Sequence, residues 1–127
     1  MLRILVVDDW PDSITSLQLL LQQWGYEARV AADGPTALEM NHRFKPDVMI
    51  LDIDMPGMDG HEVAQRLRQL DPHKPIIIAY SGYCEKADVR CALDSGCNYH
   101  LCKPTDLDEV KHLLEACEQW LLAQPSP

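Results

Sequence analysis

Residues 48–60 read VMILDIDMPGMDG, and this stretch places two carboxylates directly after a run of apolar residues. The first four residues fit a buried β-strand, whereas the Pro-Gly pair at 56–57 fits the turn that follows it. A carboxylate at the end of a buried strand is costly unless it is paired or binds a cation. Asp52 and Asp54 therefore indicate a functional site at the end of this strand.

Similar apolar runs recur along the chain, and segments with helical periodicity separate them. The runs do not alternate cleanly between apolar and polar residues, which is typical of strands covered on both faces. The predicted strands are 3–7, 26–31, 48–51, 75–80 and 99–102, and the predicted helices are 12–24, 35–44, 60–70, 85–95 and 106–122, the last capped by Thr105 or Asp106. Strands that alternate with helices favour right-handed crossovers. We therefore predict an α/β fold with a five-stranded parallel sheet and helices on both faces.

The composition fits one globular domain. The chain has 127 residues, of which 46% are hydrophobic, and this is enough for one core. We assign 1–122 to the domain and 123–127 (AQPSP) to a tail or the start of a linker. A net charge of −9 argues against direct nucleic-acid binding, which needs clustered Lys and Arg. The sequence has no signal segment and no apolar run of the roughly 20 residues that a membrane span needs, so we expect a cytoplasmic protein.

Five cysteines stand at positions 84, 91, 97, 102 and 117, without a CxxC pair. The odd count and the absence of zinc-site spacing predict reduced, mostly buried thiols. We expect these thiols to serve packing, and we expect neither zinc binding nor redox sensing from them.

Polar residues follow the ends of four predicted strands. These residues are Asp8-Asp9 after the first strand, Asp52 after the third, Ser81-Gly82 after the fourth and Lys103-Pro104 after the fifth. The carboxyl ends of parallel strands meet at one edge of the sheet, which is where open α/β sheets bind ligands. We therefore expect these residues to form one site.

The residue types at this edge suit phosphoryl chemistry. Carboxylates about 4 Å apart repel by about 4 kcal/mol per pair at an effective dielectric constant near 20, and a hard divalent cation relieves this repulsion. An all-oxygen site suits Mg²⁺ or Mn²⁺. Lys103 and Ser81 add an ammonium and a hydroxyl, and Gly82 leaves room for an incoming phosphoryl group. An aspartate here can accept that group as an acyl phosphate.

These segments resemble the receiver domain of two-component response regulators, the family of the bacterial chemotaxis response regulator. The matching pieces are VVDD at 6–9, LDIDMPGMDG at 51–60, SG at 81–82 and KP at 103–104. The resemblance covers residues 2 to about 122 and implies a flavodoxin-like sheet with strand order 2-1-3-4-5. It implies a phosphorylation-controlled signalling domain rather than a turnover enzyme.

The resemblance also implies roles in phosphoryl transfer. Asp52 would be the phosphoacceptor, taking its phosphoryl group from a phosphohistidine on a sensor histidine kinase or a phosphotransfer protein. Asp8 and Asp9 would bind Mg²⁺, together with the carboxylate of Asp52 and the backbone carbonyl of Asp54.

Further roles that the resemblance implies concern the switch. Ser81 and Lys103 would contact the attached phosphoryl group beside Gly82, and the peptide bond before Pro104 is a candidate for the cis form. The phosphorylated state would then repack the face formed by the fourth helix, the fifth strand and the fifth helix. An unidentified downstream target would dock there.

Two positions depart from the commonest receiver pattern. His100 occupies the place of the switch aromatic, with Tyr99 one residue earlier, and such a histidine resembles receivers fused to hybrid sensor kinases. Asp54 adds a carboxylate where many relatives have an uncharged side chain. With Tyr83 on the opposite flank, Asp54 is expected to tune hydrolysis of the phosphoaspartate.

Two alternatives remain from the sequence. ILDIDMP resembles the DxD motif of haloacid-dehalogenase-type phosphohydrolases, although Pro56 stands where Thr or Val is usual and the motif leaves Asp8 and Asp9 unexplained. A pseudo-receiver would keep the fold as a binding module without phosphorylation, but such domains typically lack a key acidic residue or the lysine, and all of these are present here.

Overall fold

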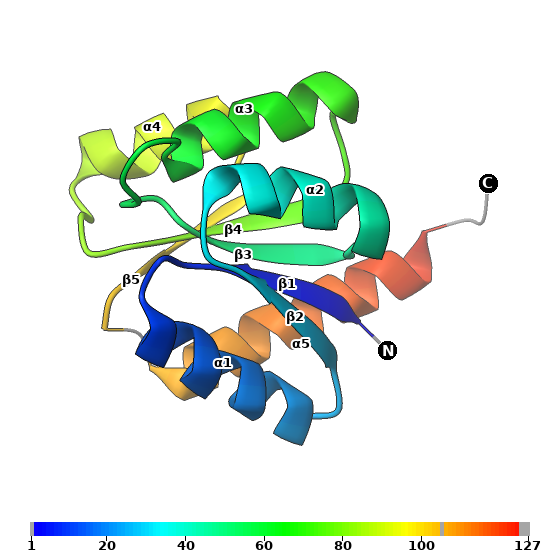
Figure 1. Cartoon of the computed structure of the whole chain (residues 1–127). Coiled ribbons are helices and arrows are strands. Elements are labelled where there is room, and N and C mark those ends of the chain that lie inside the picture. Colours follow the sequence, from blue (N-terminus) through cyan, green and yellow to red (C-terminus); the bar gives the residue numbers. More distant parts are fainter. Residues whose placement is uncertain (1, 105, 125–127) are drawn as a thin grey trace.

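Five parallel strands form one sheet in the order β2-β1-β3-β4-β5. The computed structural model describes residues 2–104 and 106–124, so the expected Thr105 cap and tail residues 125–127 lie outside the described part. The strands are β1 (Arg3–Val7), β2 (Glu27–Ala31), β3 (Val48–Asp52), β4 (Ile76–Ser81) and β5 (Tyr99–Cys102); the helices are α1 (Pro11–Gln23), α2 (Gly34–Phe44), α3 (Gly60–Leu70), α4 (Lys86–Ser95) and α5 (Leu107–Ala123). This topology confirms the predicted fold class (Figure 1).

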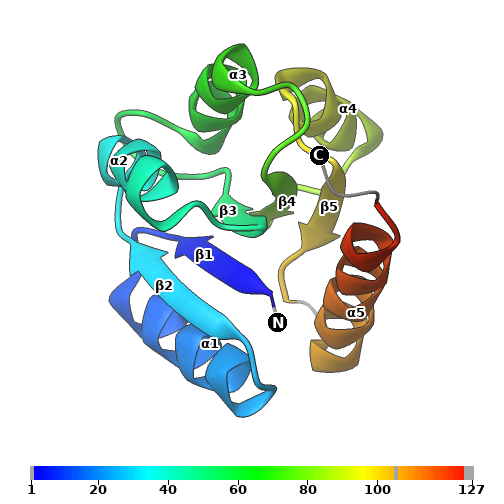
Figure 2. The same ribbon diagram turned by 90° about the vertical axis from the view of Figure 1, so that its right-hand side faces the viewer.

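Helices cover both faces of the sheet. Figures 1 and 2 show α2, α3 and α4 on one face and α1 and α5 on the other. Because successive strand residues point to opposite faces, Met49 and Ile77 pack towards α2–α4, whereas Ile50 and Ile78 pack towards α1 and α5. Burial on both sides explains why the strands read as continuous apolar runs.

Capping residues and prolines set the ends of the elements. The carboxylates of Asp33 and Asp59 accept hydrogen bonds from backbone N–H groups at the starts of α2 and α3, and Asp106 does the same for α5. Strand β4 begins at Ile76, one residue later than predicted, because Pro75 has no N–H group to donate to a neighbouring strand. None of the helices in the described ranges is long and apolar enough to cross a membrane.

Arg68 on α3 ties together the end of the molecule opposite the strand carboxyl ends. Its Nε donates to the carbonyl oxygen of Gly96 at 2.9 Å, and its Nη2 donates to the carbonyl of Pro75 at 2.7 Å and to Oδ1 of Asn98 at 2.8 Å. Gly96 ends α4 with a φ of 117°, a left-handed conformation that favours glycine. The guanidinium therefore anchors the carboxyl end of α4 to α3 and to the start of β4.

Candidate functional site

Three carboxylates meet where the central strands β1 and β3 end. Asp8 and Asp52 are buried, each with 4% of its surface exposed, and Asp9 is exposed. Oxygen atoms from the three side chains lie within 4.8 Å of one another. The sheet register explains this grouping, because Val7 at the end of β1 pairs with Leu51, the residue before Asp52. The predicted acidic cluster is therefore present.

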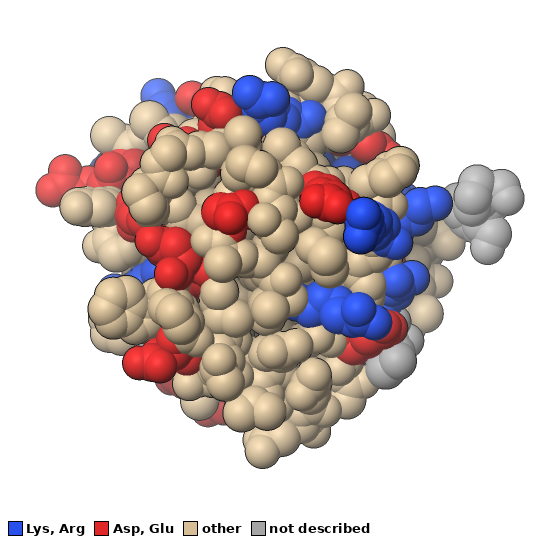
Figure 3. Space-filling view, viewed as in Figure 1, with Lys and Arg blue, Asp and Glu red and all other residues tan. Residues whose placement is uncertain are grey.

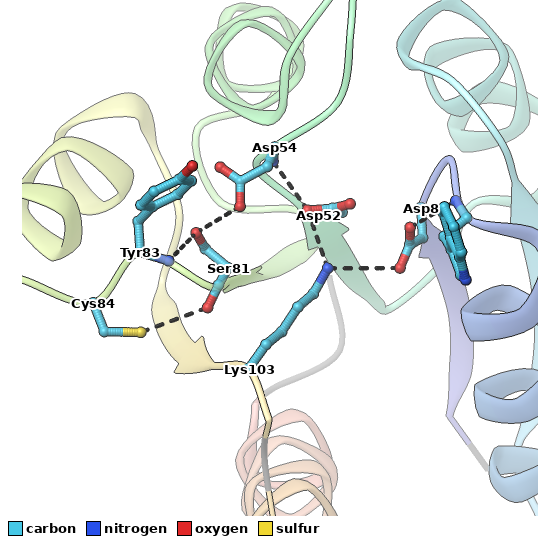
Figure 4. A network of polar contacts seen from close by, with 8 residues as sticks. Asp8, Asp52, Asp54, Ser81, Tyr83, Cys84 and Lys103 are labelled. Atoms are coloured by element: carbon cyan, nitrogen blue, oxygen red, sulfur yellow. Dashed lines mark hydrogen bonds and ion pairs between the residues drawn. The ribbon is translucent and has the colours of Figure 1, made fainter.

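Lys103 brings a positive charge into this cluster from the end of β5. Its Nζ lies 3.4 Å from Oδ1 of Asp52 and 3.8 Å from Oδ2 of Asp8 (Figure 4). The same Nζ lies 4.9 Å from the ring centroid of Tyr80, which helps to hold the side chain over the sheet. The lysine thus bridges the two buried carboxylates.

The neighbours of Asp52 act on the pKa of its carboxyl group in opposite directions. Burial raises the pKa of Asp52, and the neighbouring charge of Asp8 adds to the rise. The N–H of Asp54, which donates to Oδ1 of Asp52 at 3.0 Å, and the ammonium of Lys103 both act to lower this pKa. Asp8 has its own donor, since the N–H of Trp10 reaches Oδ1 of Asp8 at 2.9 Å.

Ser81, at the end of β4, joins both flanks of the site through its hydroxyl group. The hydroxyl donates to Oδ2 of Asp54 at 2.9 Å and accepts a hydrogen bond from the N–H of Tyr83 at 3.0 Å (Figure 4). Asp54 and the Tyr83 side chain are exposed. Asp54, Ser81 and Tyr83 therefore form a continuous hydrogen-bonded chain beside Asp52, a connection that sequence spacing did not reveal.

The remaining predicted residues lie around these groups. A Cβ added at Gly82 would meet no atom within 4 Å, so open space adjoins Ser81. The Lys103–Pro104 bond is cis, and so is Lys74–Pro75, for which no cis form was expected. His100 lies half-buried on β5, two residues before the strand ends at Cys102.

The cysteines differ from the sequence prediction. Cys84 and Cys102 form a disulfide bond, and Cys84, Cys91 and Cys102 are exposed; only Cys97 and Cys117 are buried. The reason lies in the register, because Ser81 pairs with Cys102 across β4 and β5, which brings Cys84 beside Cys102 despite a sequence separation of 18. The sulfur atoms also lie within 4.8 Å of a His100 nitrogen, a grouping that linear spacing does not show.

Gly60 is a positioning residue that was not predicted from the sequence. A Cβ at this position would lie 2.7 Å from the carbonyl oxygen of Asp52 and 2.7 Å from Cα of Ile53. Its N–H donates to the carbonyl of Ile53 at 3.1 Å. Only glycine allows α3 to begin so close to the strand end that carries Asp52. The sequence offered one signal, the glycine directly after the Asp59 cap.

Charge is unevenly distributed over the molecule. In Figure 3, Asp and Glu predominate on the left, towards the carboxyl ends of the strands, whereas Lys and Arg gather mainly on the right. Arg3 and Arg29, for example, stack on the Phe44 ring at the opposite end from the acidic cluster. The negative end favours the approach of a cation.

A sequence profile of the response regulator receiver domain matches residues 4–115. The chain belongs to the response regulator receiver family. Receiver domains are Mg²⁺-dependent phosphoacceptor signalling modules and not turnover enzymes. The acidic cluster here suits this function. The haloacid-dehalogenase alternative is therefore set aside.

Three related proteins illustrate the similarity. Response regulator PleD of Caulobacter vibrioides is 42% identical over 109 residues, which are 82% of this chain and 23% of PleD. Sensor histidine kinase RcsC of Escherichia coli is 37% identical over 113 residues, 89% of this chain and 12% of RcsC. The structure of TrrA from Thermotoga maritima in complex with Mg²⁺ and BeF is 34% identical with a TM-score of 0.81, covering 92% of this chain and 99% of that one. This chain therefore spans only a small part of PleD and RcsC.

Proposed function

We propose that Asp52 accepts a phosphoryl group from a phosphohistidine on a sensor histidine kinase or a phosphotransfer protein. The observation that carries this proposal is the position of the Lys103 Nζ, 3.4 Å from a buried Asp52 carboxylate and next to the buried Asp8. Lys103 opposes the effect of burial on the Asp52 carboxylate, whose charged form is a nucleophile, and the ammonium can neutralise the oxygen charge that builds up in transfer.

The transfer step follows from these groups. A carboxylate oxygen of Asp52 attacks the phosphorus, an acyl phosphate bond forms, and the bond between phosphorus and the donor imidazole nitrogen breaks with its electron pair returning to nitrogen. Lys103 pairs with a phosphoryl oxygen. The Ser81 hydroxyl, now bound to Asp54, turns to another phosphoryl oxygen across the open space at Gly82.

The donor set fits Mg²⁺. Asp8, Asp9 and Asp52 offer three carboxylates within 4.8 Å, and Lys103 supplies only one positive charge against them. Hard oxygen ligands suit Mg²⁺, with Mn²⁺ as a substitute. These three side chains and the backbone carbonyl of Asp54 would hold the ion, which when bound supplies charge neutralisation for the phosphoryl oxygens.

The switch in this proposal runs from Ser81 to the face formed by α4, β5 and α5. Leu93, Tyr99 and Leu107 are exposed on these three elements, with 46%, 45% and 54% of their surfaces accessible, and so offer apolar contacts to a downstream target. His100 on β5 takes the place of the switch aromatic. We propose residues 1–122 as the receiver domain, acting in the cytoplasm, where sensor kinases present their phosphohistidines.

Labelling with a small acyl phosphate and Mg²⁺, followed by intact mass, tests the assignment of Asp52. We expect a gain of about 80 Da, the mass of one phosphoryl group, that requires Mg²⁺ and is lost in Asp52→Asn. Asp94→Asn, which removes an exposed carboxylate on α4, is the matched control and should be labelled like the wild type.

Two other outcomes would change the assignment. Labelling of Asp52→Asn would place the phosphoryl group elsewhere. No labelling, together with no binding of beryllofluoride in the presence of Mg²⁺, would identify a pseudo-receiver that acts only as a binding module.

A further inference from the structure

The Cys84–Cys102 disulfide lies directly beside the phosphoryl site, and phosphoryl transfer does not use it. Cys84 stands in the connection between β4 and α4, three residues after Ser81, and Cys102 is the last residue of β5, directly before Lys103. The two Cα atoms are 5.9 Å apart, a separation typical of disulfides. The bond therefore joins the two segments that carry Ser81 and Lys103.

We propose that Cys84 and Cys102 form a site of reversible thiol oxidation, and that the disulfide restrains the phosphoryl site while the dithiol form releases it. The second half of this inference rests on the proposed function. Disulfides in cytosolic proteins are usually transient and serve catalysis or redox sensing, which suits a bond at this position.

Access to the sulfur atoms supports a reactive pair. Both cysteines are exposed, and a surface hollow of about 460 Å³ opens on Cys84. A nitrogen of His100 lies within 4.8 Å of both sulfur atoms and can take up the proton of an attacking thiol. Lys86, Arg90 and Asp94 also line the hollow, so its two cations outnumber its one carboxylate and favour the approach of a thiol that carries carboxylates.

Two other cysteines of the chain are unsuited to this chemistry. Burial raises the pKa of the Cys97 thiol and that of the Cys117 thiol to about 11. Their thiolate fraction at neutral pH is therefore very small, and no reactant reaches them from solvent. Cys91 is exposed on α4 and is a free thiol, which makes it the natural control.

The coupling to the phosphoryl site runs through the Ser81 backbone. The carbonyl oxygen of Ser81 accepts the N–H of Lys103 at 2.8 Å, and Sγ of Cys84 lies 3.5 Å from the same oxygen (Figure 4). The proposed function requires the Ser81 hydroxyl to leave Asp54 and turn to the phosphoryl group. A covalent bond from Cys84 to β5 holds the loop that must follow this movement, so the oxidised form should hold a phosphoryl group less well.

The chemical step is thiol–disulfide exchange. A thiolate of a dithiol reductant attacks Sγ of Cys84, and the sulfur of Cys102 leaves as a thiolate and takes up a proton. The second thiol of the reductant then displaces Cys84. Two electrons and two protons pass to the protein, and the reductant becomes a cyclic disulfide. A small disulfide such as oxidised glutathione runs the reaction in reverse, leaving two small thiols.

The test compares the full chain after treatment with dithiothreitol and after treatment with oxidised glutathione. Alkylation under denaturing conditions, read by intact mass, should find all five thiols in the reduced chain and three in the oxidised chain. The affinity for beryllofluoride in the presence of Mg²⁺ should fall by about fivefold or more on oxidation, since about fivefold is the smallest change in affinity typical of coupled sites. Cys84→Ser and Cys102→Ser should abolish this redox response, and Cys91→Ser should retain it.

Each other result overturns part of the inference. Five alkylated thiols after oxidation would refute the disulfide, and equal beryllofluoride affinities of the two forms would refute the coupling. One Zn²⁺ bound by the reduced wild type but not by Cys84→Ser, without any redox response, would assign the cluster with His100 to a metal instead. If neither form bound beryllofluoride or accepted a phosphoryl group, the proposed function and the coupling would both fall, while the alkylation result would still decide on the disulfide.

Discussion

Replacing Lys103 by methionine should expose the electrostatic cost of the acidic cluster. Methionine keeps much of the length and volume of the lysine stem but removes the positive charge between Asp8 and Asp52. These two carboxylates are buried, so in the variant they would face each other without a cation. Lys103→Met should therefore destabilise the metal-free protein and make its stability depend more strongly on Mg²⁺.

The magnitude follows from the two ion-pair distances. At an effective dielectric constant of about 20, a separation of 3.4 Å corresponds to about 5 kcal/mol and one of 3.8 Å to about 4 kcal/mol. The lysine side chain is 31% exposed, and solvent screening and its own desolvation offset much of this sum. Loss of one partner of a buried ion pair costs about 3–5 kcal/mol, and we expect the lower end here. A loss of about 3 kcal/mol corresponds to a fall in Tm of roughly 10 °C.

Chemical denaturation at pH 8, with a chelator and then with saturating Mg²⁺, measures both effects. We expect Mg²⁺ to restore most of the lost stability, because the cation replaces the missing charge. Lys86→Met, which removes an exposed lysine at the start of α4, should stay close to the wild type. A metal-free Lys103→Met within about 1 kcal/mol of the wild type, or an equal Mg²⁺ effect in both proteins, would refute the reasoning.

Three further predictions concern residues around the cluster. Burial raises the pKa of Asp52 above its ordinary value of 3.8, so the metal-free wild type should lose stability as pH rises through the raised pKa. Asp52→Asn should remove this loss and be the more stable protein at neutral pH, which denaturation across pH 3–8 can show. Gly60→Ala should lower the free energy of unfolding by about 1–3 kcal/mol, because its methyl group would clash with backbone atoms. Gly82→Ala, whose methyl group would contact no atom, is the control, and equal stabilities of the two variants would contradict the close packing at Gly60. Asp54→Asn and Tyr83→Ala should both change the rate at which the phosphorylated protein loses its phosphoryl group. Asp54→Asn removes the negative charge that accepts from the Ser81 hydroxyl, and Tyr83→Ala removes an exposed ring beside the site. Unchanged rates, measured by mass spectrometry over time, would remove their role.

The sequence predicted most of the fold because its signals are local. Apolar runs covered on both faces and helical stripes locate all ten elements within one residue of their observed ends. The acidic cluster was also predictable, because parallel strands bring their carboxyl ends to one edge, Asp8 and Asp9 follow β1, and Asp52 is the last residue of β3.

The features that the sequence did not predict depend on register and side-chain direction. The Cys84–Cys102 bond requires Ser81 to lie opposite Cys102 on neighbouring strands, and no spacing rule contains that pairing. The Ser81–Asp54 hydrogen bond depends on which way the buried Ser81 hydroxyl and the exposed Asp54 carboxylate turn. Such contacts are set by tertiary packing rather than by the local pattern.

Because Arg68 anchors the carboxyl end of α4, we expect any movement of this helix to be a tilt about that end. Arg68 holds the carboxyl end of the helix through Gly96 and Asn98, whereas the first turn is capped from within, by the Glu85 N–H donating to the Asp88 carboxylate. A helix of 10 residues is about 15 Å long. If α4 tilts about its anchored carboxyl end, its first turn moves farthest and its last turn stays almost in place. A partner that distinguishes the phosphorylated from the unphosphorylated domain should therefore bind at the beginning of this helix. A partner that binds both forms with equal affinity should contact its end.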